Sequence, residues 1–489
     1  MLAGFPDIDP AFAGREGVAE LVALLCSGGD ARIALDPETR LNRYLAAPYP
    51  RRTLALASST ANDISPAAFD HLLALRGAGQ VSYADHLRAL RQRITAVYGL
   101  ERDTGIIFTP SGTDCEFVAL AAAQGRAKNG VHNILLGADE VGSGCIHSAR
   151  GCHFAESTAL GHASEAGEPV AGIDPVTLCD VPVRCARGEA RGSREIAEVI
   201  RAEILRARKG AQHALLHVVH GSKTGLILPR MREVDALRAE FGEHLSLVVD
   251  ACQARITADA VRDYLARGAI VLLTGSKFMG GPPFSGFALV PATMIENAAP
   301  LPHGFARLFR RAEWDPRWPG HERLEQSANP GLAMRIEASI FELERFEALG
   351  HEEARRVILA FQRAIRTLLL HRTGWRPIVT YRPGNAEEAR DHPLEMLTLA
   401  TLDMSAHPQA ATFEDARGLY RSLEARGLRL GQPVKCVPRE DGRWAGTLRI
   451  GLSMPQICAL ADLADHALER AMFERIGRFA ETLAAPVPP

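Results

Sequence analysis

The 489-residue sequence has almost no net charge, because 56 lysines and arginines face 58 aspartates and glutamates. A chain without an excess of basic residues has no long-range field that attracts nucleic acid or an anionic membrane surface. It also lacks any run of about 18 apolar residues, the length that a membrane-spanning helix needs. Both absences argue against a nucleic-acid-binding protein and against a membrane protein.

Cysteine is sparse: nine residues, an odd number, are scattered from Cys26 to Cys458. This distribution does not match a disulfide framework. The opening MLAGFPDIDPAF has acids and prolines where a secretory leader has a basic end and an apolar run, so we expect a protein of the reducing cytoplasm. The cysteines and histidines of 145–153 match no zinc-binding spacing, and we predict no metal site.

The sequence does contain a regular order of apolar segments. Short β-branched runs alternate through the middle of the chain with segments that have apolar residues at i, i+3 and i+4, as amphipathic helices do. This order predicts a mostly parallel sheet with helices on both faces. The seven predicted strands are 106–110, 133–137, 176–183, 214–220, 245–250, 269–274 and 286–291. The last follows a Gly/Pro loop without a helix, so we expect it to be antiparallel.

The length allows roughly two to three domains. We expect 1–75 to join a small domain to the edge of the active site, and 76–300 to form the large domain around the sheet. Residues 301–489 are expected to form a long connecting helix and a smaller α/β domain. The first hundred residues are predicted to be mostly helical, with a loop at SSTANDISP (58–66).

Two predicted strands end in polar groups suited to a ligand. The first leads to Ser111-Gly112-Thr113, a glycine turn with hydroxyls before a helix, which is typical of a phosphate site. A capped helix start explains that turn equally well. Another strand ends at Asp250, and a carboxylate there is costly to bury unless a cation or a hydrogen bond compensates it. Asp250 capping the next helix is the alternative.

The following strand leads to Thr274-Gly275-Ser276-Lys277. A partly desolvated lysine can act as an amine nucleophile, although a single lysine is more often on the surface. The combination is more specific than any part. A phosphate cradle, an acid and an amine at successive strand ends are the groups that pyridoxal phosphate (PLP) requires for its phosphate, its ring nitrogen and its aldehyde.

With these motifs the sequence resembles the fold-type I PLP enzymes, and within them the class V aminotransferase and cysteine desulfurase group. The resemblance covers roughly residues 53–463. It implies an aminotransferase-like α/β fold: a three-layer α/β/α large domain with a seven-stranded, mostly parallel sheet, and a smaller α/β domain. It also implies PLP as cofactor and an amino acid as substrate.

The resemblance assigns roles to individual residues. Lys277 would bond to the cofactor as a Schiff base and move the α-proton, Asp250 would hold the pyridine nitrogen, and Gln253 would contact the ring oxygen O3′. The residues implied to bind the phosphate are Gly112, Thr113, Thr274 and Ser276.

Two later motifs resemble family segments as well. LEQSANPG is similar to the segment that reaches the neighbouring subunit's site, which implies a homodimer with Ser327 near the phosphate held by the other subunit. TLRIGLSMPQI is similar to the strand that carries an arginine for the substrate carboxylate, which implies that role for Arg449. An ordinary ion-paired arginine is the alternative at this position.

The sequence also departs from the family. DEVGSGCIHSARG stands where relatives have a histidine or aromatic residue stacked on the cofactor ring, so Ser143 or His147 would approach the ring instead. Ser222 stands where relatives often have asparagine near O3′. Both departures would change the electronic properties of the cofactor ring, so the reaction cannot be inferred from a single relative.

We expect aminotransfer on an amino acid, with a C–S or other β-lyase as runner-up and desulfuration or decarboxylation as further alternatives. Cys436 occupies the place of the desulfurase nucleophile, but the Arg-Thr-Gly signature before it is absent, which favours a buried cysteine. A PLP-binding protein without catalysis is a remote alternative, because no basic DNA-binding extension is apparent. An arginine-rich loop at 303–320, with Arg307, Arg310, Arg311 and Arg317, is a candidate for binding an acidic side chain.

Overall fold

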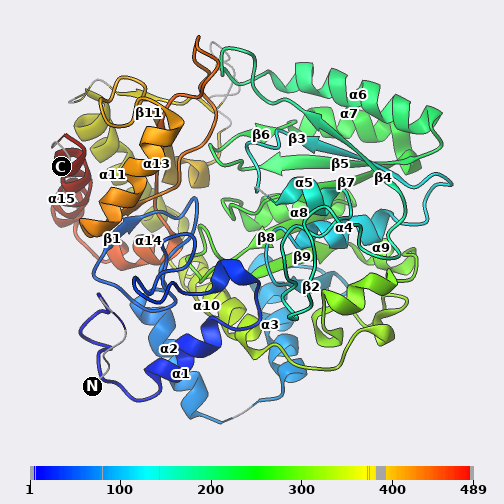
Figure 1. Ribbon diagram of the computed structural model, residues 1–489, viewed down its shortest axis with the longest axis horizontal. Coiled ribbons are helices and arrows are strands. Elements are labelled where there is room, and N and C mark those ends of the chain that lie inside the picture. Colours follow the sequence, from blue (N-terminus) through cyan, green and yellow to red (C-terminus); the bar gives the residue numbers. More distant parts are fainter. Residues whose placement is uncertain are drawn as a thin grey trace.

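The computed structural model describes residues 5, 7–79, 81–142, 144–371, 373, 375–380 and 392–484. Its centre is an eight-stranded sheet, on the right in Figure 1. In spatial order the strands are β2 (Gly105–Thr109), β9 (Gly286–Val290), β8 (Ile270–Thr274), β7 (Leu245–Asp250), β5 (His213–His220), β3 (Val131–Leu136) and β4 (Val176–Val181), with the short β6 (Ile227–Leu228) paired to β5. All seven predicted strands are present, and β6 was not predicted.

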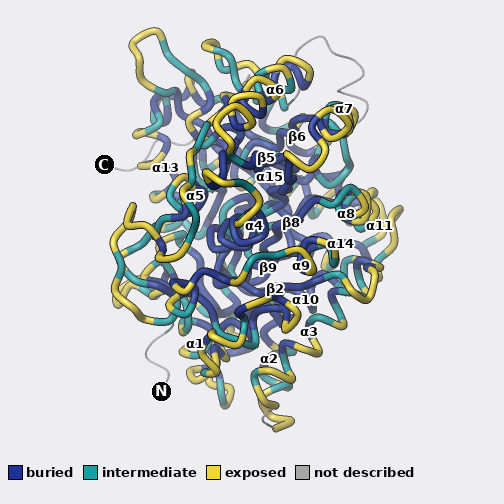
Figure 2. The backbone as a smooth tube through the Cα atoms, turned by 90° about the vertical axis from the view of Figure 1, so that its right-hand side faces the viewer, coloured by how far each residue is buried: buried dark blue, intermediate teal, exposed yellow. Residues whose placement is uncertain are grey.

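The sheet is mostly parallel, as expected. β8, β7, β5, β3 and β4 pair in parallel, while β9 is antiparallel to β8 and to β2. The predicted strand 176–183 ends at Val181, because Pro182 has no N–H for the ladder. The strand backbones lie among the buried segments in the interior of Figure 2.

Helices cover both faces of the sheet, which gives the three layers. On one face lies α4 (Cys115–Ala123), with α5 (Cys145–Ala149) packed against it, and alternate strand residues such as Val248 and Leu272 pack there. Their neighbours Val249 and Leu273 point to the opposite face. Helices on or near that opposite face are α3 (Tyr83–Tyr98), α6 (Ser193–Lys209), α7 (Met231–Phe241) and α8 (Ala258–Ala266).

Helix α6 shows why these segments are helical. Ile196, Ile200 and Ile204 repeat every four residues and are fully buried beneath the helix. Glu195 in the first turn and Lys209 in the last match the helix dipole.

The C-terminal part gathers on the left of Figure 1. A three-stranded antiparallel sheet of β10 (Arg376–Pro377), β11 (Leu399–Asp403) and β13 (Thr447–Gly451) lies with α13 (Phe413–Ala425), α14 (Met454–Ala461) and α15 (Asp465–Ala484). The expected long helix is divided into α10 (Pro330–Glu347) and α11 (His351–Ile365). The break is at Gly350, whose φ of 89° is outside the right-handed helical range. A π-helical turn, Arg366–His371, follows α11.

The N-terminal part joins these two regions. Helices α1 (Val18–Leu25) and α2 (Pro66–Gly77) pack on α10, and β1 (Leu54–Leu56) pairs in parallel with β12 (Leu428–Leu430). Most of 26–65 is loop rather than the predicted helix, and 58–66 is the expected loop. The remaining short elements are α9 (Ala292–Glu296) and 3-10 turns at Ala31–Ile33, Gly242–His244, His303–Arg307, Arg311–Glu313, His321–Arg323 and Leu394–Thr398. Among the described helices, none combines the length and apolar character needed to cross a bilayer.

Candidate active site

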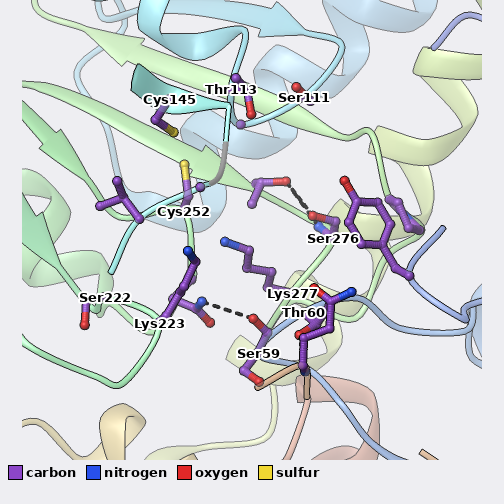
Figure 3. A pocket seen from close by; sticks show the side chains of 18 of the residues that line it. Ser59, Thr60, Ser111, Thr113, Cys145, Ser222, Lys223, Cys252, Ser276 and Lys277 are labelled. Atoms are coloured by element: carbon purple, nitrogen blue, oxygen red, sulfur yellow. Dashed lines mark hydrogen bonds between the residues drawn. The ribbon is translucent and has the colours of Figure 1, made fainter. Parts of the chain in front are cut away.

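A cavity of about 320 Å³ lies at the carboxyl ends of the parallel strands. Loops that follow β2, β3, β5, β7 and β8 line one side, and this is where open α/β sheets bind ligands. The other side comes from the loops after β1 and β12 and from Arg449 on β13. The cavity is therefore closed by segments from both ends of the chain, and Lys277 lies near the centre of this view in Figure 3.

The predicted phosphate cradle lies on this cavity. The amide N–H groups of Gly112 and Thr113, just before α4, donate to no acceptor in the described part of the chain. Thr274 Oγ1, at the end of β8, lies 2.8 Å from Ser276 Oγ in the loop that follows. Ser276 lies on the cavity wall in Figure 3. Gly112 is closely approached, because a Cβ there would lie 3.1 Å from Cys252 Sγ and would require that side chain to shift. Free amides and hydroxyls at a helix start form an anion site.

Asp250 and Lys277 face the same cavity, and neither has an ionic partner within 4.0 Å among the described residues. The Asp250 side chain is on the α4 face of the sheet, since it alternates with Val249, and only 9% of the residue is exposed. One carboxylate oxygen accepts a 3.0 Å hydrogen bond from the Cys252 amide. A buried carboxylate with so little compensation is costly unless a ligand cation or a ligand N–H faces it.

Arg449 is 3% exposed and is held by neighbouring acceptors. Its Nε donates to the carbonyl of Gln432 (2.7 Å), one terminal nitrogen to the carbonyls of Ser59 (3.1 Å) and Lys223 (3.2 Å), and the other to Thr60 Oγ1 (2.9 Å). Four of the five N–H groups are used, so one remains for a ligand. A bidentate contact with a substrate carboxylate would require that one of these bonds be exchanged.

In another part of the cavity wall, the carboxylate of Glu140 accepts hydrogen bonds at both of its oxygens. Glu140, after β3, accepts from Arg184 Nε (2.6 Å), Ser222 Oγ (2.8 Å) and Thr224 Oγ1 (2.9 Å). Burial alone would raise the pKa of Glu140, but the Arg184 guanidinium and the two hydroxyls hold it below its usual value. Ser222 lines the cavity, yet its hydroxyl proton is committed to Glu140, which leaves it no proton to give a ligand.

Gln253 also lines the cavity and is bonded within the protein, although one of the two N–H groups of its side-chain amide has no acceptor in the described chain. Its amide nitrogen donates to the carbonyl of Ser59 (3.2 Å), and its oxygen accepts from Arg255 (2.7 Å). Arg255 is fully buried and lies 5.1 Å from the ring centre of Phe278. This network joins the loop after β7 to the loop after β1.

The structure brings most of the predicted site residues to one cavity. Those that line it are Gly112, Thr113, Ser222, Asp250, Gln253, Thr274, Ser276, Lys277 and Arg449. Ser143 lies outside the described residues, and His147 is half-buried but is not part of the lining. Ser327 is also away from the cavity, and its Oγ is buried without a hydrogen-bond partner in the described chain.

The arginine-rich loop does not reach the cavity. Arg310 pairs with Glu325 and Arg317 with Asp315, each at 2.7 Å, while Arg307 donates to the carbonyl of Ala163. None of its four arginines belongs to the lining. In this chain they bond within the loop or to adjoining segments.

Several lining residues were missed by sequence reasoning: Arg32, Tyr44, Ser59, Thr60, Val141, Cys145, Lys223, Cys252, Phe284 and Gln432. Cys252 and Lys223 directly adjoin residues that were singled out. Arg32 and Tyr44 come from an N-terminal loop and carry no local signal of a site. Val141 and Cys145 occupy the region where a ring-stacking residue was expected.

The nine cysteines are all free thiols. Burial raises the pKa of the Cys145 and Cys252 thiols well above the ordinary range, and it raises the pKa of Cys436 to about 12. Cys436 is 2% exposed and does not line the cavity. These three thiols therefore stay protonated near neutral pH and are poor nucleophiles. The described residues contain no group of three or more side chains placed to hold a metal ion.

No protein-family model matches the sequence, and no curated protein matches it. Solved structures do match it in fold. The cysteine desulfurase CsdA of Escherichia coli is 14% identical with a TM-score of 0.54, over 88% of this chain and 96% of that one. The ureidoglycine–glyoxylate aminotransferase of Bacillus subtilis is 12% identical with a TM-score of 0.52, over 88% and 97%.

A third similar structure is the serine palmitoyltransferase of S. paucimobilis, solved with a bound PLP–myriocin aldimine. It is 16% identical with a TM-score of 0.50, over 96% of this chain and 98% of that one. At such identities the likeness concerns the fold alone. The fold implied by the sequence motifs is confirmed: the chain has the fold of the fold-type I PLP enzymes.

Proposed function

We propose that the protein is a PLP-dependent enzyme that transforms an amino acid, and that the reaction is aminotransfer. The observation that carries this proposal is the set of uncommitted groups around one cavity. The amine of Lys277 and the amides of Gly112 and Thr113 have no hydrogen-bond partner in the described chain, and Asp250 has only the Cys252 amide and no cation, although buried polar groups that lack partners are rare in folded proteins. They match the three polar parts of PLP.

The fit can be checked group by group. The phosphate suits the cradle of Gly112, Thr113, Thr274 and Ser276, where backbone amides, hydroxyls and the α4 N-terminus provide donors. A protonated ring nitrogen suits the Asp250 carboxylate, which has no cation within 4.0 Å in the described chain. When bound, PLP supplies an aldehyde for amines and a ring that accepts electron density.

The chain's own residues then have separate tasks. Lys277 Nζ provides the amine that bonds to the cofactor, and it afterwards takes and returns the α-proton of the amino acid. Asp250 keeps a proton on the ring nitrogen. Arg449 offers its remaining N–H to the substrate carboxylate. Phe284, which is 4% exposed, lines the cavity and restricts the access of water to it.

The thiols favour aminotransfer over desulfuration. A desulfurase needs a thiolate, and burial keeps Cys145, Cys252 and Cys436 protonated. Ser222 stays in the proposed cofactor site as a residue that shapes its wall, because its hydroxyl proton is bonded to Glu140, whereas Gln253 keeps one amide N–H for the ring oxygen O3′. We also propose that the protein forms a homodimer in which Ser327 lies near the phosphate held by the other subunit. Its proposed location is the cytoplasm.

The test is spectroscopic. Purified protein is incubated with PLP and freed of excess, and single amino acids are added one at a time without keto acid. Aminotransfer predicts that the visible band of the bound cofactor bleaches and that one equivalent of keto acid appears. A band that persists while pyruvate, sulfide or carbon dioxide accumulates would replace aminotransfer by lyase, desulfurase or decarboxylase activity. No visible band at all would overturn PLP dependence.

A further inference from the structure

The cavity holds a second lysine that the proposed chemistry does not use. Lys223 lies between β5 and β6, directly after Ser222, and lines the cavity together with Lys277 (Figure 3). Arg449 lines the same cavity. Its Nζ donates to the carbonyl of Asp139 at 2.9 Å. An ammonium group has three N–H bonds, so two of them lack an acceptor in the described chain.

Lys223 also lacks a carboxylate partner. No Asp or Glu oxygen of the described residues lies within 4.0 Å of its Nζ, and the same is true of Arg449. Glu140, whose backbone carbonyl accepts from the Lys223 amide, has its carboxylate already paired with Arg184. Two cationic side chains therefore adjoin each other, linked by the 3.2 Å bond from Arg449 to the Lys223 carbonyl. Such an arrangement is costly without an anion between or beside the two charges.

The cofactor does not provide that anion. Its phosphate fits the neutral donors of Gly112, Thr113 and Ser276, and its ring nitrogen fits Asp250. The α-carboxylate of an amino acid satisfies one cation, Arg449. One positive charge of the cavity wall, on Lys223, then remains for another anionic group of the substrate.

We propose that Lys223 is a specificity-determining residue that binds a second acidic group, so that the substrate is an amino acid with a carboxylate in its side chain. The inference rests on the proposed function, because it assumes that the cofactor and the α-carboxylate occupy the other groups. The flexible side chain of a lysine with two free N–H donors can bind carboxylates at different distances, which a rigid guanidinium does less well.

The charge of Lys223 sets the pH range of this recognition. Burial, followed by the neighbouring cations Arg449 and Lys277, lowers the pKa of Lys223 to about 8, while Cys145 and Glu140 act in the opposite direction. The ammonium form is present below that pKa. The affinity for the second acidic group should therefore fall as the pH rises through about 8.

Calorimetry on the PLP-loaded protein tests this with two probes, succinate and butyrate, which differ in one carboxylate. We expect K223M to weaken succinate binding about 10- to 100-fold, the value of one charge-assisted hydrogen bond, and to leave butyrate unchanged. K223R should retain most of the affinity, and K209M on the exposed end of α6 is the matched control. In K223M the pH dependence above 8 should disappear. Unfolding midpoints of all variants confirm that they are folded.

Kinetics with aspartate, glutamate and alanine provide the second readout. K223M should raise KM for the two acidic amino acids while alanine is unaffected. Equal binding of succinate and butyrate by the wild type overturns the inference and leaves the proposed function intact. A fall in kcat that is the same for all three amino acids would also overturn it, since Lys223 would then be moving protons. If no cofactor band forms, the proposed function fails and the inference fails with it.

Discussion

Two buried carboxylates on the same cavity differ in how they are satisfied. Glu140 is held by a guanidinium and two hydroxyls and has no capacity to spare. Asp250, at the end of β7, has one backbone amide and no cation within 4.0 Å in the described chain. Both residues are at most 9% exposed, so burial does not explain the difference.

This difference distinguishes side chains that stabilise the cavity wall from side chains that are available to bind a ligand. A buried charge that is fully paired contributes to the folded state, and removing its partner leaves an uncompensated ion. A buried charge without a partner lowers stability, so it is retained at a functional site for its chemistry. The comparison makes opposite predictions for substitutions at the two sites.

The largest expected effect is that of Lys277→Ala. Loss of the amine should abolish the visible band of the bound cofactor and reduce turnover by at least about 1,000-fold, since both covalent bonding and proton transfer depend on it. Stability should change little, because no ion pair is lost. Absorbance after PLP loading and a keto acid assay measure this, with Lys209→Ala as control. A normal band in Lys277→Ala would move the catalytic amine elsewhere.

Asp250→Asn removes a charge without changing shape. We expect turnover to fall about 100-fold, because the ring nitrogen loses the group that keeps it protonated. The same variant without cofactor should unfold at an equal or higher urea concentration than the wild type, since an uncompensated buried charge is gone. Steady-state kinetics and urea titration measure the two quantities. A clear loss of stability would mean that Asp250 belongs to the wall.

Glu140→Gln should show the reverse pattern. It leaves the Arg184 guanidinium buried without its carboxylate, which should cost about 3 kcal/mol in the free energy of unfolding. Cofactor binding per folded molecule should be nearly retained. Urea titration measures the loss, and Glu240→Gln on the exposed pair with Arg201 is the control. If the two glutamates gave equal changes, the wall would not depend on Glu140.

The same residue predicts a pH dependence. The pKa of Glu140 is lower in the folded state than in the unfolded chain, so its contribution is complete above the ordinary glutamate value and is lost as the pH falls below it. Unfolding free energies measured from pH 7 down to about pH 3 should therefore decrease more in the wild type than in Glu140→Gln, and the difference should appear below the ordinary glutamate pKa. If the wild type and Glu140→Gln lost equal unfolding free energy as the pH fell, the partners of Glu140 would not lower its pKa in the folded state.

The sequence predicted the strand ends well because the signals there are local. Apolar β-branched runs that stop at Asp250 or at Thr274 identify both the strand and the edge where its end lies, and parallel strands bring such ends together. The antiparallel β9 was predicted from a Gly/Pro loop that contains no helix. The fold and the uncommitted half of the site were therefore predictable.

The remaining half depends on contacts between distant segments. Tyr44 reaches the cavity through a loop that the sequence pattern assigned to helix, and Gln432 through the strand β12 that pairs with β1. Whether Ser222 faces a ligand depends on Glu140, which lies 82 residues earlier. Lys223 carried no signal because a lone lysine is usually exposed. Which side chains from distant segments contact each other is decided by the tertiary structure, and the sequence pattern does not show it.

The smallest expected effect concerns Cys436, which is neither an unpaired ligand group nor part of the paired wall. Cys436→Ala should cost about 1 kcal/mol of stability from lost packing and leave turnover and cofactor binding unchanged. Its thiol is protonated at neutral pH because burial raises its pKa to about 12. Sulfide release from cysteine, compared between wild type and variant, is the measurement. A loss of sulfide release on this substitution would restore the desulfurase alternative and place Cys436 on a loop that moves.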